Sequence, residues 1–184
     1  YRHIELSAKV LGVALVLEIS IVVLLDLAIV ASPGPSGLTL ASFHPDVFTN
    51  GALGIAVLFA LTGFIGFEAT AVFRDEARDP ERTIPRATYA AVLIIGAFYA
   101  VTCWAFVAAI GPDQVAAVAQ RTLAGDGNML LDTTEASLGR VGRDVVNVLL
   151  LTSLFACVLS FHNVIARYQF VLAGKGLLPA RLAR

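Results

Sequence analysis

Residues 59–87 read FALTGFIGFEATAVFRDEARDPERTIPRA, and this stretch decides how the rest of the chain is interpreted. Its first half belongs to an apolar run, residues 51–73, that is interrupted by Gly63, Gly66 and Glu68. A helix of about 23 residues rises about 35 Å, which is enough to cross a hydrocarbon core of about 30 Å. The second half is dense with charged residues and proline. The stretch therefore predicts a membrane-spanning segment that ends in a water-exposed turn.

Three more apolar runs flank this stretch, at residues 8–30, 88–110 and 145–173. Hydrophobic residues make up 58% of the 184-residue chain, whereas soluble domains contain about 45–50%. A soluble helical core can hold one run of this length, but four runs separated by polar segments are hard to explain in that way. The sequence predicts an all-α transmembrane fold with four membrane-spanning helices.

Polar connections of unequal charge join the four runs, at residues 31–50, 74–87 and 111–144. Of the 13 Lys and Arg residues, three lie in 111–144 and none in 31–50, so the rest lie at the chain ends and in 74–87. Because positive residues accumulate on the cytoplasmic side, we expect both chain ends and 74–87 in the cytoplasm and the other two connections outside. This pattern indicates a multi-pass protein of the cell membrane.

Two local features of these connections carry further predictions. Residues 112–123 are expected to form a short helix on the outer surface, because the segment is too short to span the bilayer. Thr83 is expected to cap the helix that contains run 88–110, with Pro85 in its first turn, where the missing N–H of proline is tolerated.

Composition argues against several other classes of function. The net charge is −1 and the basic residues are not clustered with aromatic ones, so nucleic acid is not an expected partner. His3, His44 and His162 are scattered, and neither an HExxH motif nor paired carboxylates occur. We therefore expect no enzyme, no metal site and no cofactor. Cys103 and Cys157 lie inside apolar runs and are expected to be free, buried thiols.

The two glycines in the second run allow two interpretations. A small-residue face lets helices pack closely in membranes, which would explain Gly63 and Gly66 without any binding role. Alternatively, the helix is broken near the bilayer centre, as in transporters that bind charged substrate groups with freed backbone amides and carbonyls. Glu68 favours the second interpretation, since a carboxylate at the bilayer centre costs about 2.5–3.5 kcal/mol and is a functional candidate by default. It could also simply hydrogen-bond a neighbouring helix.

Two motifs resemble one known family. Residues 63–68 and 76–87 resemble the sixth helix and following loop of the amino acid–polyamine–organocation (APC) superfamily of permeases. Asn163, Arg167-Tyr168 and the segment 174–179 are similar to the end of that family's eighth helix and its Gly-x-Leu-Pro loop. The resemblance implies that the four runs are family helices five to eight of a five-plus-five inverted-repeat fold. Because the chain starts at Tyr1 rather than Met, we expect it to be a fragment, with partner helices elsewhere in the same permease.

The resemblance also implies a substrate site at a break in the second run. Backbone carbonyls of residues 59–62 would accept the ammonium group of an amino acid, and Glu68 would act in gating or coupling. Residues from the last run would face the pocket from the other side. The implied substrate-binding residues are Phe59, Thr62, Gly63, Phe64, Ile65, Gly66, Ser160 and Phe161.

Coupling to an ion is where the chain departs from the family. Some members carry a lysine in helix five that exchanges protons, and Glu18 occupies the approximately corresponding position here. An acid can also carry a proton, although the changed sign of charge puts the family mechanism in doubt, and a neighbouring helix could equally satisfy Glu18. Asp26 is expected to extend toward water at the outer end of its run. His162 could relay protons, but a structural hydrogen bond is the favoured interpretation.

The sequence thus predicts secondary active transport of an amino acid by alternating access, coupled to protons. The alternative is a membrane-embedded amino acid sensor or a non-transporting subunit built on the same fold. A carrier accumulates its substrate across a bilayer, whereas a sensor only binds it. The expected partners are the amino acid, protons, lipid and the remaining helices.

Overall fold

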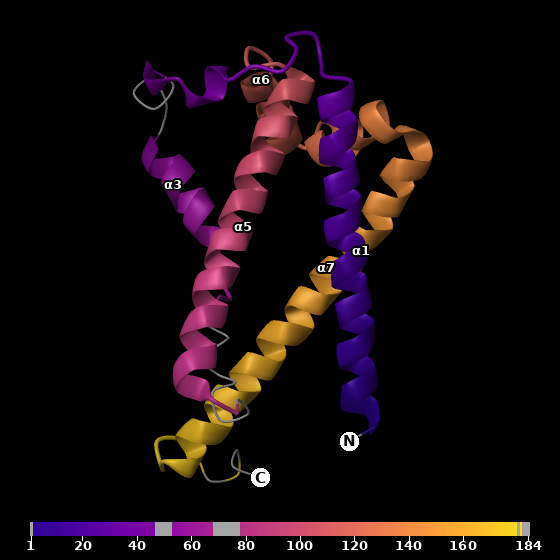
Figure 1. Cartoon of the computed structure of the whole chain (residues 1–184). Helices are drawn as coiled ribbons and strands as arrows, with labels where there is room; N and C mark the ends of the chain where they lie inside the picture. The colour runs from indigo at the N-terminus through magenta and orange to yellow at the C-terminus, as the bar shows by residue number, and fades with distance from the viewer. Residues whose placement is uncertain (1, 47–52, 68–77, 180, 182–184) are drawn as a thin grey trace. The chain divides into compact units, whose positions relative to one another are not determined.

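The structure is a computed structural model that describes residues 2–46, 53–67, 78–179 and 181, with side chains described from residue 12 onward. Every regular element in these residues is helical (Figure 1). In chain order the elements are α1 (Arg2–Ala31), η1 (Ala41–Phe43), α3 (Leu53–Thr62), α5 (Pro80–Ile110), α6 (Val115–Leu123) and α7 (Met129–Gly174). Three of them contain segments long and apolar enough to cross a membrane, namely Gly12–Ala31, Pro80–Ile110 and Met129–Gly174.

The second apolar run differs from the other three. Within it the structure describes α3, a 10-residue apolar helix that ends at Thr62, and a turn over residues 63–67. The flanking residues 51–52 and 68–73 lie outside the described part of the chain. The described helix is therefore too short to span a bilayer by itself.

Helix α5 begins earlier than the sequence suggested. Its first residue is Pro80, and the amide of Thr83 donates to the carbonyl of Asp79 at 2.8 Å, so Thr83 lies within the helix. Proline is well suited to the first helical position because its ring fixes φ and its missing N–H has no helical acceptor there. The prediction that Thr83 caps this helix is therefore wrong, and Pro85 lies inside the helix.

Helix α7 also starts earlier, inside the predicted outer connection. Asn128 precedes it and accepts a hydrogen bond from the Leu131 amide at 3.1 Å, while Asp132 accepts one from the Asn128 amide at 3.0 Å. This reciprocal pair stabilises a helix start. At Gly139 the backbone leaves helical geometry (φ 73°, ψ −177°), so α7 consists of two helices, 129–138 and 140–174. The predicted surface helix is α6, which starts at Val115.

The chain divides into two compact units, one made of Tyr1–Leu58 and Gly96–Ser153, the other of Phe59–Ile95 and Leu154–Arg184. The first unit contains a small apolar core between α1 and α5. Leu25 and Ile29 lie one helical turn apart on α1 and pack with Ala105 and Ala108 of α5. The two alanines let the helix backbones approach closely, which is typical of membrane helix contacts.

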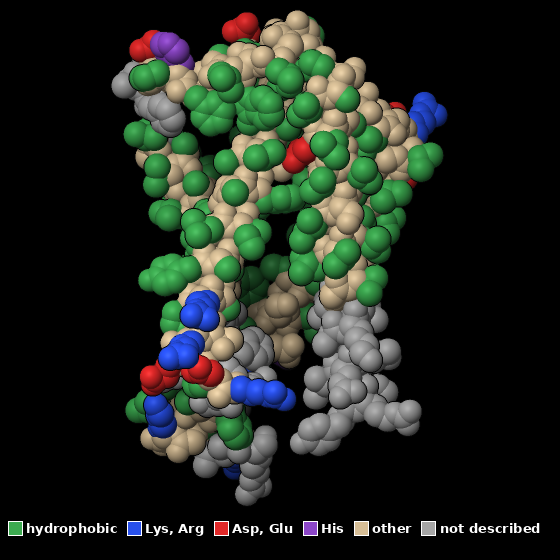
Figure 2. Space-filling view, in the orientation of Figure 1, with side chains coloured by type: hydrophobic (Ala, Val, Ile, Leu, Met, Phe, Trp, Pro, Cys, Tyr) green, Lys and Arg blue, Asp and Glu red, His purple; other side chains and the backbone are tan. Residues whose placement is uncertain are grey.

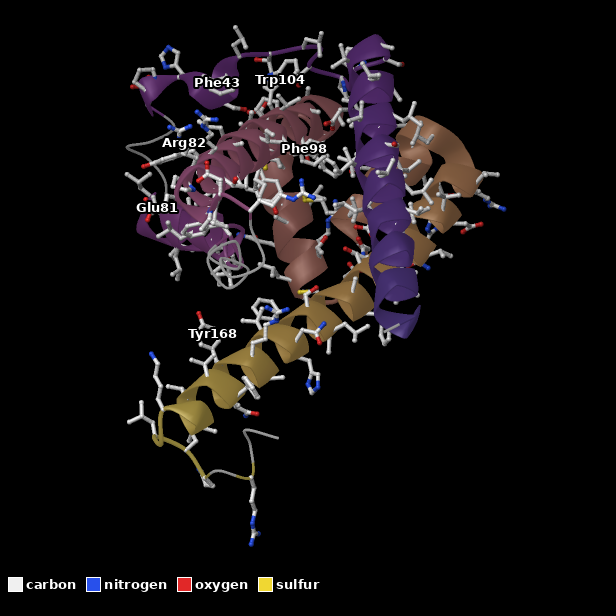
Figure 3. The ribbon with its side chains drawn as sticks, turned by 60° about the horizontal axis from the view of Figure 1, so that its bottom comes forward. Phe43, Glu81, Arg82, Phe98, Trp104 and Tyr168 are labelled. Carbon is white, nitrogen blue, oxygen red and sulfur yellow. The ribbon has the colours of Figure 1, made fainter. Side chains whose placement is uncertain are left out.

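The loop after α1 is tied to the end of α5. Gly34 donates a backbone hydrogen bond to the carbonyl of Ala108 at 3.1 Å, and a Cβ atom at Gly34 would lie 2.0 Å from the carbonyl oxygen of Ala109. Only glycine can therefore occupy this position without moving backbone. The indole of Trp104, labelled in Figure 3, donates to the carbonyl of Thr39 at 2.8 Å.

Most apolar side chains of the described helices are exposed (Figure 2). Figure 2 shows them along the length of the helices, whereas basic and acidic side chains gather around the start of α5. A surface of this kind is suited to lipid or to further helices rather than to water. Cys103 and Cys157 are free but exposed, so the prediction that these thiols are buried is wrong.

Candidate functional site

The helical hydrogen-bond pattern changes at the end of α3. The amides of Phe64 and Ile65 donate to carbonyls only three residues back, those of Leu61 and Thr62, at 3.1 and 3.2 Å. Gly66 then adopts φ +107°, a conformation that residues with a Cβ atom rarely adopt. The α-helix therefore does not continue in regular form through residues 63–67, inside an apolar run.

The carbonyl groups at this helix end are not equally available to a ligand. The carbonyl of Phe59 accepts two hydrogen bonds, from the Gly63 amide at 3.2 Å and from the Thr62 hydroxyl at 2.7 Å. Because a carbonyl oxygen has two lone pairs, these two hydrogen bonds leave the Phe59 carbonyl no lone pair for a ligand. The carbonyls of Leu61 and Thr62 each accept one backbone amide and retain a second lone pair.

The side chains of this turn are largely open. Phe59 is 69% exposed and Ile65 61%, while Phe64 is partly buried. Ser160 and Phe161, the other residues implied for the substrate site, lie on α7 within the same unit and are both exposed. Exposed apolar and hydroxyl groups in a membrane-spanning region must face lipid, further helices or a water-filled cavity.

The two carboxylates implied in coupling differ in how far the structure describes them. Glu68 lies outside the described residues. Glu18 lies on α1, where it is half-buried and makes no hydrogen bond or ion pair with any residue whose side chain is described. An intramembrane carboxylate without a partner is costly, so Glu18 needs water, a proton or a group from another helix.

A third carboxylate has a partner that sequence reasoning missed. Asp26 is only 7% exposed, and one of its oxygens accepts a hydrogen bond from the Thr102 hydroxyl of α5 at 2.8 Å. Its other oxygen is buried with no partner among the described residues. The prediction that Asp26 extends toward water is therefore wrong, because α5 covers it. The sequence offers only a general signal for this contact, namely that an acid within a membrane-spanning run faces the bundle interior or water and has a polar partner.

Comparison with known proteins identifies the family of this chain. The sequence profile of the family described as amino acid permease matches residues 4–184. The chain belongs to the amino acid permease family. Membership implies an inverted-repeat helical fold in a multi-pass membrane protein, and it places the permease among transporters rather than enzymes.

The similar proteins are much longer than this chain. An uncharacterized transporter of Mycobacterium bovis is 31% identical over 137 residues, which cover 74% of the permease chain and 26% of the relative. The serine/threonine exchanger SteT of Bacillus subtilis is 28% identical over 130 residues, 68% of the permease chain and 27% of the relative. The chain thus spans about a quarter of the length of the curated relatives it matches. No solved structure matches it closely enough to count as similar.

Proposed function

We propose that this chain is the part of a secondary active amino acid transporter that contains family helices five to eight, including a discontinuous sixth helix. The observation that carries the proposal is the end of α3 at Thr62 inside an apolar run, followed by the turn with Gly66 at positive φ. Irregular backbone at membrane depth is tolerated only where protein covers it or a cavity hydrates it. In transporters such a cavity holds the substrate.

The hydrogen bonds of the turn refine which groups would bind the substrate. The carbonyls of Leu61 and Thr62 have free acceptor capacity for the ammonium group, whereas that of Phe59 has none. In this proposal the side chains of Thr62, Phe64 and Ile65, with Ser160 and Phe161 of α7, contribute to selectivity. The glycines at 63 and 66 allow the backbone to approach the ligand closely.

The decisive test is uptake by the full-length protein in proteoliposomes. Radiolabelled L-serine and L-threonine are the first probes, because one relative is a serine/threonine exchanger; the other protein amino acids follow. Uptake that needs an inward proton gradient would support proton-coupled symport. Uptake that needs unlabelled amino acid inside would identify an exchanger. Binding without uptake under either condition would favour the alternative, a sensor or non-transporting subunit.

For coupling we propose Glu68 and Glu18. Glu68→Gln should abolish uptake or uncouple it from the proton gradient, and Glu18→Gln should reduce its dependence on pH. Glu81→Gln is the matched control, because Glu81 lies exposed at the start of α5 (Figure 3). Unchanged pH dependence in both test variants would remove these residues from the coupling step.

We also propose that both ends of this segment and the loop before α5 face the cytoplasm. The support is the excess of Lys and Arg on that side. In a full-length background without native cysteines, single cysteines at Asp79 and Asp113 should react with a membrane-impermeant thiol reagent from opposite sides. Labelling of Asp79→Cys from outside intact cells would reverse the orientation.

A further inference from the structure

A pocket of about 580 Å³ lies in the first unit, between the end of α1, the end of α5, α6 and the start of α7. Its volume is in the range of about 300–1,000 Å³ that is usual for small-molecule sites. The lining combines one cation, two carboxylates and several hydroxyl groups. The lining residues that bear on its chemistry are Ser32, Arg121, Asp126, Asp132, Thr133 and Ser137.

The turn after α6 brings opposite charges to this pocket. The Asp126 amide donates to the Arg121 carbonyl at 2.9 Å, and the Gly125 amide donates to the Thr122 carbonyl at 3.1 Å, with Gly125 at φ +82°. This is the hydrogen-bond pattern of a Schellman helix end, in which a glycine at positive φ reverses the chain. The backbone thus fixes Arg121 and Asp126 at one turn.

The charged side chains of the pocket do not form ion pairs with one another. Two other arginines of the same connection, Arg140 and Arg143, both pair with Glu135. Arg121, by contrast, makes no ion pair or hydrogen bond through its side chain with any described residue, and the same holds for the carboxylate of Asp126. Arg121 and Asp126 are both exposed, so both signs of charge remain available to a ligand that enters the pocket.

The remaining polar groups favour a ligand rather than a purely structural role. One carboxylate oxygen of Asp132 accepts a hydrogen bond from the Asn128 amide, so the other oxygen can accept one from a ligand. Thr133 is only 8% exposed, yet it lines the pocket and makes no hydrogen bond through its hydroxyl with another described residue. Because this hydroxyl oxygen is not itself buried, it is accessible to a molecule in the pocket.

We propose that this pocket binds the zwitterion of an α-amino acid. The planar guanidinium of Arg121 is suited to bidentate contact with the carboxylate, and Asp126 and Asp132 accept hydrogen bonds from the ammonium group. The two carboxylates outnumber the single guanidinium, which disfavours a simple anion, and a simple cation would leave Arg121 without a partner. The pocket contains no residue of the turn at 59–67, so it is a second site. The choice of an amino acid among zwitterions rests on the proposed transport function.

The test is equilibrium binding to the purified full-length protein. The probe is whichever radiolabelled amino acid gives the highest uptake in a screen of the twenty, and its methyl ester serves as a probe without a carboxylate. We expect two sites per protein in the wild type. Arg121→Gln should weaken one of them about tenfold or more, the effect of losing a charge-assisted contact. At the site that Arg121→Gln weakens, the ester should bind equally weakly in the wild type and in the variant, because it has no carboxylate for Arg121 to contact.

Two further variants make the result specific. Arg140→Gln removes an arginine that is already paired and should leave both sites unchanged. Ala136→Phe fills the pocket without altering a charge and should eliminate the same site as Arg121→Gln. A single site in the wild type, or two unaltered sites in both pocket variants, would overturn the second site while leaving transport intact. If no amino acid binds or enters the liposomes, the proposed function itself fails as well.

Discussion

The region where the ends of α1 and α5 meet differs from the turn after α3 in its hydrogen bonds and in the exposure of its side chains. In the first region polar groups find partners across elements: Asp26 with Thr102, Trp104 with Thr39, and Gly34 with Ala108. In the turn at 63–67, the amides of Phe64 and Ile65 donate to carbonyls three residues back within the same segment, and the side chain of Ile65 is largely exposed.

We interpret the contact between the ends of α1 and α5 as structural support, and the turn at 63–67 as part of the transport site. The first region can hold its geometry with residues of this chain, whereas the turn needs cover from other helices or a hydrated cavity. If so, damage to the first region should reduce the amount of folded protein. Damage to the turn should reduce transport while folding is kept. All the variants below refer to the full-length protein.

The largest effect should come from Gly34→Ala. The new Cβ would lie 2.0 Å from the carbonyl oxygen of Ala109, and backbone cannot move aside as a side chain can. Overpacking costs about 1–3 kcal/mol, and we expect the upper end here. The measurement is the yield of monodisperse protein and its thermal unfolding temperature in detergent. Gly12→Ala is the control, since a Cβ there meets nothing within 4 Å; equal behaviour of the two variants would contradict the structural role of this region.

Gly66→Ala should act next most strongly, and on transport rather than folding. A Cβ at this position meets no atom within 4 Å, so the penalty comes only from φ +107°. Strain of this kind costs about 1–3 kcal/mol, which corresponds to roughly a tenfold lower uptake rate if the turn must keep its shape. Gly54→Ala on α3, also in open space, is the matched control. Full uptake by Gly66→Ala would show that the turn is not part of the site.

A smaller effect is expected from Thr102→Val. The substitution keeps the shape of the side chain but leaves the buried carboxylate of Asp26 without its only described hydrogen bond, at a cost of about 1–2 kcal/mol. Thr152→Val is the control, because its hydroxyl bonds only to its own helix, at the carbonyl of Leu149. Thermal unfolding of both variants measures the difference. Adding Asp26→Asn to Thr102→Val should remove much of the loss, and failure to do so would argue that the pair is not coupled.

The smallest effect should come from Trp104→Phe. It removes one hydrogen bond, to the carbonyl of Thr39, while keeping most of the aromatic area, so we expect about 1 kcal/mol of destabilisation. Unfolding temperature again provides the measurement, and uptake per folded molecule should be unchanged. A fall in uptake without a fall in stability would contradict the assignment of this region to folding rather than transport.

Sequence reasoning found the apolar runs because hydropathy over about 20 residues is a local property. It was less successful with helix starts. Thr83 is the predicted cap of the third apolar helix, yet α5 starts at Pro80, and the helix at 129–138 falls in a predicted connection. In both cases a polar composition concealed a helix whose start is stabilised by a suitable proline or by a pair of capping side chains.

The sequence by itself determined the membrane character of the chain, its charge asymmetry, and the position of the glycines that end α3, since each depends on residues close together along the chain. Only the tertiary structure decided that Asp26 is buried against Thr102, 76 residues away, and that Arg121 shares a pocket with Ser32 and Asp132. Such pairings depend on how helices pack, and the spacing of residues within one helix does not specify which faces of two helices meet.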